Sequence, residues 1–239
     1  MKKVLAYLFS LVLLGSLAVL YSFSSMKNSN KIIKDVEIEF VEGANDFLTQ
    51  SMVNKLLIQN QRGVKNQAKS VIDLQGLEHA MLSNPYIEKA TVYYTIDGVL
   101  KTIVKQRTPI ARVNAFNSSY YVDKQGVEVP LSNNYSARVV LVTGEVNNGE
   151  LKEITDFVNV ILADDFLKKE VIGIHKKQNK EYVLSVRSGF YKIELGELDQ
   201  IKTKFTKLKA FYNSIGDYKI LEKYKTINLK YHNQVVCAK

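Results

Sequence analysis

The sequence predicts an α+β fold in three parts. A transmembrane helix comes first, followed by a small unit in which two helices cover a three-stranded sheet, and then by a larger mixed α/β unit with a mostly antiparallel sheet. Three observations lead to this prediction. The N-terminus holds a long uncharged stretch, the hydrophobic period changes from about 3.6 to about 2 after Asn84-Pro85, and short alternating segments joined by turn residues fill the second half.

The uncharged stretch runs from Val4 to Met26 and suffices for a membrane helix, which needs about 20 residues. Lys2 and Lys3 precede it, so we expect residues 1–3 to form a cytoplasmic tail and the bulk of the chain to be exported. A polar linker is expected over residues 27–31. The expected anchor residues are leucines spaced three apart: Leu5, Leu8, Leu11, Leu14, Leu17 and Leu20.

A cleaved signal peptide is the alternative reading of this N-terminus. Ser22-Phe23-Ser24 has the small-x-small pattern of a cleavage site, although the apolar run is longer than the usual signal core. The chain would then be a secreted protein that binds cell-wall glycan or an acidic polymer.

The small unit is predicted over residues 32–108. Apolar and acidic residues alternate up to Phe40, which is typical of a strand with one solvated face. Two short amphipathic helices follow, and Asn84-Pro85 ends the second, because the residue before a proline avoids the helical region. Two alternating strands then flank Asp97-Gly98, a tight-turn dipeptide.

Residues 109–239 predict the larger unit, because several alternating segments are interrupted by two amphipathic helices. The helix over 197–211 carries lysines on one side, including Lys202, Lys204, Lys207 and Lys209, and we expect that side to be solvated. The expected strands are 120–123, 127–130, 138–143, 171–174, 181–186, 191–195, 226–231 and 235–237, and the expected helices are 150–162 and 197–211.

The composition narrows the class of partner. The net charge is +9, from 33 basic and 24 acidic residues, which favours an anionic neighbour such as lipid headgroups, cell-wall polymer or an acidic protein. The lysines are spread along the chain without an arginine-rich or stacking motif, so nucleic acid is not expected. Cys237 is the single cysteine, which excludes an intramolecular disulfide.

No catalytic constellation is predicted. His79, His175 and His232 lack metal-ligand spacing, and Asp164-Asp165 is interpreted as a solvated helix terminus, because adjacent residues on a helix do not face each other. We therefore expect no enzyme activity, cofactor, metal or small-molecule substrate.

Two motifs carry a resemblance to a known family. They are Asn84-Pro85-Tyr86-Ile87-Glu88-Lys89-Ala90 and Gln106-Arg107-Thr108-Pro109-Ile110-Ala111, which flank the predicted hairpin and are followed by Tyr120 to Val127. Their order after one apolar helix resembles the FtsQ (DivIB) family of bacterial cell-division proteins. Gln106 departs from the family pattern, which usually has Glu there. The resemblance implies a POTRA domain over 32–108 and an FtsQ-type β domain over 109–239.

The resemblance also implies a function and a site. It implies a non-enzymatic scaffold of the division machinery, single-pass in the inner (plasma) membrane with a periplasmic bulk, whose terminal strands pair with membrane proteins of FtsB and FtsL type. A terminal strand at a sheet edge offers unpaired N–H and C=O groups to another chain. A frayed terminus is the alternative. The expected partner-binding residues are Ile227, Leu229, Tyr231, Asn233, Val235, Val236 and Cys237.

Overall fold

The computed structural model describes residues 2–41, 46–60, 64–115, 118–215 and 218–239. It divides into two compact units, Met1–Gln106 and Arg107–Lys239. The expected three-part α+β architecture is confirmed: an apolar helix, a three-stranded sheet with helices, and a larger sheet with helices.

Helix α1 spans Lys2–Ser29, so it continues through the first three residues of the expected linker. Nothing in Lys27-Asn28-Ser29 breaks a helix, and Asn30 N still donates to the Met26 carbonyl. Within the described residues, Tyr7–Ser29 is the one helical segment long and apolar enough to cross a membrane. The six expected anchor leucines are all exposed on α1, which suits contact with lipid. Met1, part of the expected cytoplasmic tail, lies outside the described residues.

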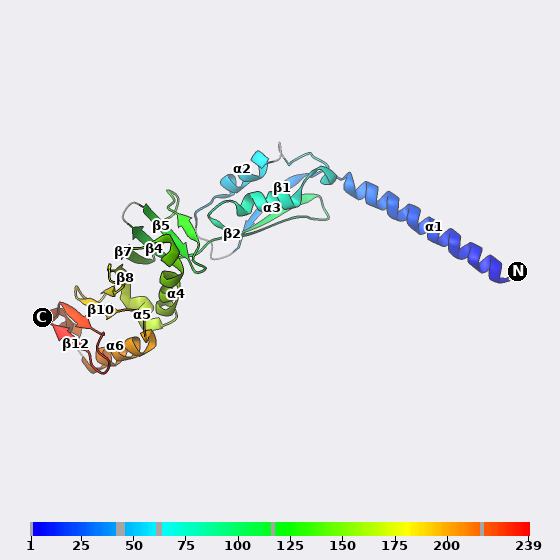
Figure 1. The fold of residues 1–239 in the computed structure, drawn as a ribbon. Helices are drawn as coiled ribbons and strands as arrows, with labels where there is room; N and C mark the ends of the chain where they lie inside the picture. Colours follow the sequence, from blue (N-terminus) through cyan, green and yellow to red (C-terminus); the bar gives the residue numbers. More distant parts are fainter. Residues whose placement is uncertain (1, 42–45, 61–63, 116–117, 216–217) are drawn as a thin grey trace. The chain divides into compact units, whose positions relative to one another are not determined.

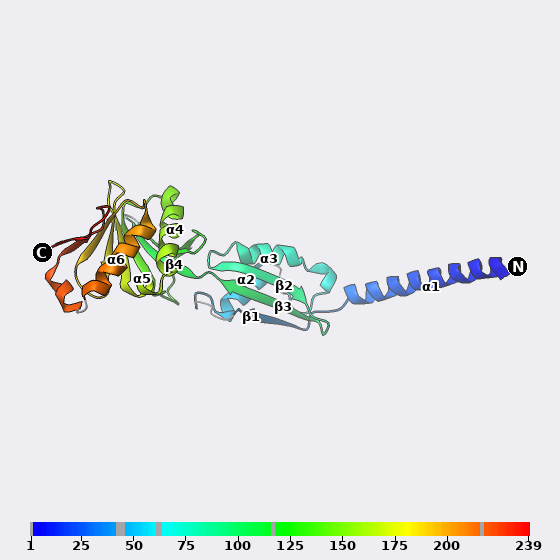
Figure 2. The same ribbon diagram turned by 90° about the horizontal axis from the view of Figure 1, so that it is seen from below.

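The first unit is built on a sheet with the order β1-β3-β2. The central strand β3 (Val99–Gln106) pairs in parallel with β1 (Asp35–Phe40) and antiparallel with β2 (Ile87–Tyr94). Gly98 closes the β2–β3 hairpin with a φ of 87°, a conformation that favours glycine. Helices α2 (Gln50–Asn60) and α3 (Leu74–Leu82) cover the sheet (Figures 1 and 2).

One core fills the first unit. Its buried side chains come from both helices and all three strands or their flanks, and include Ile33, Val53, Leu77, Ile87 and Leu100. A short 3-10 helix, Lys69–Val71, precedes α3, whose N-terminus is capped by the Asp73 carboxylate.

The second unit is a nine-stranded sheet with the order β12-β11-β10-β9-β8-β7-β4-β5-β6. Three neighbouring pairs are parallel (β4/β7, β7/β8 and β10/β11) and the other pairs are antiparallel, which confirms the mostly antiparallel prediction. The strands are β4 (Pro109–Ala115), β5 (Ser118–Asp123), β6 (Glu128–Pro130), β7 (Val140–Gly144), β8 (Val171–Lys176), β9 (Tyr182–Val186), β10 (Lys192–Gly196), β11 (Thr226–Asn228) and β12 (Val236–Ala238).

Helices α4 (Leu151–Leu162), α5 (Asp165–Glu170) and α6 (Ile201–Ile215) lie on one face of this sheet (Figure 2). Their apolar sides share one core with the inward side chains of the strands. Short 3-10 helices, Asn148–Glu150 and Tyr218–Lys223, precede α4 and β11.

Asp164 lies at a helix terminus, as expected: it starts α5, and its carboxylate accepts hydrogen bonds from Phe166 N and Leu167 N. The terminus is not simply solvated, because the same carboxylate pairs with the Lys209 ammonium group at 2.6 Å. Helix α6 begins at Ile201 rather than at residue 197, and its lysines are not uniformly solvated. Lys204 is buried, and its ammonium group donates to the Glu197 carbonyl and to the Asp199 carboxylate, so it closes the turn before the helix.

Candidate partner-binding edge at the last strand

Strand β12 is the outermost strand of the second sheet (Figure 1). It pairs antiparallel with β11, with Ile227 opposite Cys237, and β11 pairs in parallel with β10. Within the described ranges no strand lies on the other side of β12. A strand paired on one side presents alternate N–H and C=O groups outward, so another extended chain can pair with it.

The opposite edge of the sheet is chemically different. It is formed by β6, which ends in Pro130. Proline has no N–H to donate to a neighbouring strand, and it is a common means of protecting an edge. The two rims are therefore not equivalent, and β12 is the rim whose three residues all carry an N–H group.

The seven expected partner-binding residues do not share one environment. Ile227 and Leu229 are completely buried in the core of the second unit. Their side chains are enclosed by this core and fix β11 beneath the edge; a role of these two residues in partner binding stays a prediction. Val235 and Cys237 are partly buried against the same core.

The remaining three residues form the accessible part of the candidate site. Tyr231 is 50% exposed, Val236 is 38% exposed and Asn233 is exposed. Tyr231 does not continue the alternation of β11 as expected, because the strand ends at Asn228. The Asn228 side-chain oxygen accepts a hydrogen bond from Lys230 N, which turns the chain out of the strand direction.

The loop between β11 and β12 is held from two sides. On the side of the helices, the Lys207 ammonium group of α6 donates to the carbonyl oxygens of Leu229 and Tyr231. At the strand end, Leu229 N donates to the Glu194 carbonyl of β10, at 2.9 Å. These contacts hold the first part of the loop, up to Tyr231, before the chain enters β12.

A charged cluster lies next to this loop. The Lys230 ammonium group is 3.1 Å from both carboxylate oxygens of Glu181 and 3.8 Å from Glu194. The hydrogen bond with Glu181 raises the pKa of Lys230, and the same bond lowers the pKa of Glu181. The Lys230 stem lies over Gly196, where an added Cβ would approach it to 2.9 Å. This network was missed because its members are far apart in the sequence.

Cys237 and the histidines supply no catalytic arrangement. Burial raises the pKa of the Cys237 thiol, which disfavours the reactive thiolate. His175 Nδ1 lies 3.0 Å from the Thr143 hydroxyl, an ordinary contact between neighbouring strands. Among the described residues, no group of three or more His, Cys, Asp or Glu side chains is placed to hold a metal ion.

Comparison with known families agrees with this architecture. Residues 31–105 match the model of a POTRA-like domain. Residues 108–238, more than half of the chain, match the model described as FtsQ/DivIB, C-terminal related. No curated protein matches the chain. The match over the whole second unit, preceded by a POTRA-like domain and an apolar helix, means that the chain belongs to the FtsQ/DivIB family of cell-division scaffold proteins.

Proposed function

We propose that this protein is a non-enzymatic, single-pass membrane scaffold of the division machinery that docks partners of FtsB and FtsL type by strand addition at β12. The observation that carries the proposal is that β12 is paired on one side only within the described chain. Strand addition uses main-chain hydrogen bonds for affinity and neighbouring side chains for specificity.

The side chains around β12 support this use of the edge. Tyr231 is half exposed beside the strand, and aromatic side chains are common anchors at protein interfaces. Val236 adds an apolar contact on the strand itself. Lys207 and Asn228 hold the connecting loop, so less conformational entropy is lost when a partner binds.

Co-purification tests the docking proposal. The full-length chain is compared with a variant that combines Tyr231→Ala with deletion of Val235–Lys239. Phe190→Ala is the matched control, because Phe190 is a fully exposed aromatic residue of the same unit that lies in the β9–β10 turn. We expect the control to retain an FtsB-type partner and the edge variant to lose it. Unchanged capture by the edge variant contradicts docking at β12.

The proposed topology places the N-terminus in the cytoplasm and both units in the periplasm. Helix α1 supplies the span, and the described part of the chain offers no second one. N-terminal sequencing of the membrane fraction tests whether the anchor is retained: Met1 or Lys2 is expected, whereas Ser25 would indicate cleavage and favour the secreted polymer-binding alternative. Digestion of spheroplasts by added protease tests the orientation, because both units should be degraded.

A further inference from the structure

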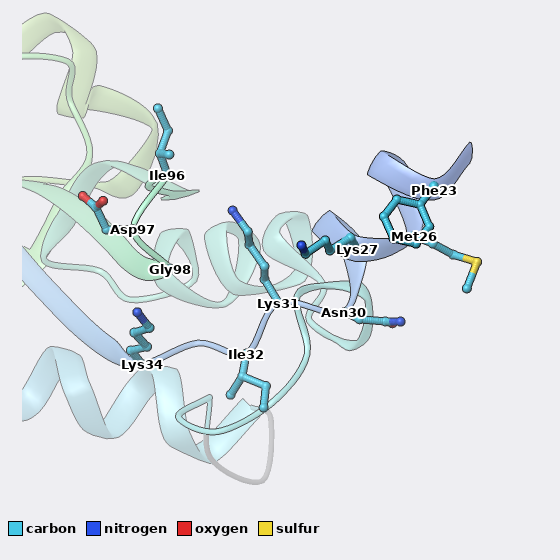
Figure 3. Close-up of a pocket in the computed structure, with 10 residues that line it drawn as sticks. All are labelled: Phe23, Met26, Lys27, Asn30, Lys31, Ile32, Lys34, Ile96, Asp97 and Gly98. Atoms are coloured by element: carbon cyan, nitrogen blue, oxygen red, sulfur yellow. The ribbon is translucent and has the colours of Figure 1, made fainter. Parts of the chain in front are cut away.

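Three lysines surround the point where the chain leaves the proposed membrane span. Lys27 lies in the last turn of α1, and Lys31 and Lys34 follow within five residues of its end at Ser29. All three are exposed. Together with the β2–β3 turn they line a recess of about 790 Å³. Figure 3 shows Lys27 and Lys31 between the end of α1 and the turn at Asp97-Gly98, and Lys34 beside Gly98.

Backbone hydrogen bonds join the β2–β3 turn and the 3-10 helix to the residues that follow α1. Lys34 N donates to the Gly98 carbonyl at 2.9 Å, and Lys69 N donates to the Lys31 carbonyl at 3.0 Å. The tip of the β2–β3 hairpin and the 3-10 helix beginning at Lys69 therefore both lie beside the residues that directly follow α1. If α1 crosses the bilayer, these two segments are the parts of the first unit that come closest to it.

The charge of these lysines is not neutralised locally. Lys65 and Lys101, elsewhere in the first unit, pair with carboxylates of β1. For Lys27, Lys31 and Lys34, the described residues include no carboxylate within ion-pair distance, and the one acidic residue lining the recess is Asp97. An excess of cations therefore lies at the exported end of the proposed span.

Exposed apolar side chains accompany the cations. Ile96, at the hairpin tip, is 89% exposed, Val71 is 68% exposed and Ile32 is 56% exposed. A hairpin turn in water usually carries polar residues. Apolar side chains beside lysines are typical of a surface that lies in a membrane interface.

The positions of the lysines also favour a surface that lies in the membrane interface. In the proposed topology they lie on the exported side, although lysines flanking a span are usually concentrated on the cytoplasmic side. An attractive interaction on the periplasmic side of the membrane would offset that preference. Phosphate groups of anionic lipids supply one, because a lysine close to an anionic bilayer surface is attracted to it.

We propose that this end of the POTRA-like unit is a binding site for anionic phospholipid headgroups. Lys27, Lys31 and Lys34 contact lipid phosphates, and Ile96 enters the headgroup region. The site would fix the first unit against the outer surface of the membrane. This inference depends on the proposed anchoring and orientation of α1.

The absence of tryptophan from the sequence makes a direct test possible. Ile96→Trp introduces a single indole at the hairpin tip of the full-length chain. The chain is reconstituted in nanodiscs of phosphatidylcholine alone, or mixed with phosphatidylglycerol, with lipids brominated near the top of the acyl chain as quenchers. Phe190→Trp is the matched control, because it places an indole at a fully exposed position of the second unit.

We expect the emission of the indole at position 96 to shift to the blue and to be quenched in phosphatidylglycerol nanodiscs, while the indole at position 190 stays unquenched. Changing Lys27, Lys31 and Lys34 to Gln should remove the quenching, and raising the salt from 0.1 to 1 M should weaken it, because the Debye length falls from about 10 to about 3 Å. Changing the exposed Lys89, Lys124 and Lys168 to Gln should leave the quenching intact.

Co-elution of every variant with the nanodisc reports separately on the anchor. Loss of co-elution means that the anchoring proposal has failed. Retained co-elution with an unquenched indole at position 96 overturns the lipid site alone. An unquenched indole together with lysine-dependent binding of soluble polyphosphate also overturns it, and would assign the lysines to a phosphate-rich polymer.

Discussion

The Lys207 ammonium group donates a hydrogen bond to the carbonyl oxygen of Tyr231, and so joins helix α6 to the loop that leads into the last strand. The same group also reaches the Leu229 carbonyl, at 3.2 Å. One cation therefore donates to two carbonyl groups of an irregular loop. A lysine on the helical layer thereby determines how the edge of the sheet is presented.

Replacing this cation should loosen the edge. We expect Lys207→Met, which keeps the apolar stem, to lower the free energy of unfolding by about 1 kcal/mol, because the hydrogen bonds are partly exposed. Amide exchange should accelerate over residues 226–238 and stay unchanged in β4. Lys202→Met is the control, because Lys202 is exposed on the same helix. Equal exchange rates in the two variants would contradict a supporting role for Lys207.

The Glu181–Lys230 pair predicts a pH dependence of the same loop. The pKa of Glu181 is lowered, so its contribution is present above about pH 4.5 and is lost as the pH falls through its value in the folded protein. The pKa of Lys230 is raised, so its contribution is present below about pH 10.5 and is lost as the pH rises through its folded value.

The size of this contribution should be small, because both side chains are partly exposed. We expect Glu181→Gln to cost less than about 1 kcal/mol at neutral pH and nothing measurable in strong acid. Urea unfolding at a series of pH values measures the difference between the variant and the original chain. A difference that stays constant from pH 7 to strong acid would show that the ion pair does not contribute.

The contacts of Gln106 suit an amide rather than the glutamate that the family usually has at this position. Its side-chain oxygen accepts from Leu48 N at 2.9 Å and its NH₂ group donates to the Leu48 carbonyl at 3.2 Å, with only 3% of the residue exposed. A carboxylate accepts but does not donate. We expect Gln106→Glu to destabilise the first unit by about 2 kcal/mol at neutral pH.

The pH dependence of the Gln106→Glu penalty distinguishes the loss of the donated hydrogen bond from an unspecific loss of packing. Burial raises the pKa of an introduced carboxyl group, and its protonated form can donate to the Leu48 carbonyl. The penalty should therefore shrink as the pH falls through the raised pKa of the introduced carboxyl group, and level off below about 4.3, the ordinary value for glutamate. Denaturant unfolding measures it, with the exposed Gln75→Glu as control. A penalty that does not depend on pH would refute this account of Gln106.

Arg107 and Asp123 form a nearly enclosed ion pair in the second unit. The guanidinium and carboxylate groups are 2.8 Å apart, with 16% and 3% of their side chains exposed. Asp123 also accepts from Gln125 N and Val127 N, so the pair braces the turn between β5 and β6. We expect Arg107→Ala to destabilise the unit by about 3 kcal/mol, because it leaves a buried charge without its cation.

Thermal or urea unfolding of the full-length chain measures this effect. Arg138→Ala is the control, because Arg138 is exposed, and it should change the stability by less than about 0.5 kcal/mol. Similar losses for the two substitutions would mean that the pair is not a special feature of the unit.

Local pattern predicted most of the elements but not their neighbours. The hairpin at Asp97-Gly98 and the stripe of α4 follow from spacing alone. Strand β4 was not predicted, although Ala111, Val113 and Ala115 alternate with Arg112 and Asn114; it opens on Pro109 and pairs with both β5 and β7. The strands that it pairs with are up to about 30 residues away in the chain, and local alternation does not identify them.

In the candidate site, too, local pattern did not reveal contacts between distant residues. Alternation from Ile227 to Tyr231 predicted one common face, but a side-chain hydrogen bond at Asn228 ends the strand after three residues. The lysines of α6 look equivalent in sequence, yet Lys204 and Lys207 each reach backbone carbonyl groups, whereas Lys202 is exposed. Long-range partners decide such roles, and spacing carries no information about them.

Docking at β12 is best tested by hydrogen–deuterium exchange of the full-length chain in nanodiscs, with and without the exported part of an FtsB-type partner. We expect the amides of Val236–Ala238 to exchange more slowly in the complex, while Glu128 and Val129 on the opposite edge do not change. A complex that forms with unaltered exchange in β12, and with protection elsewhere, would contradict it.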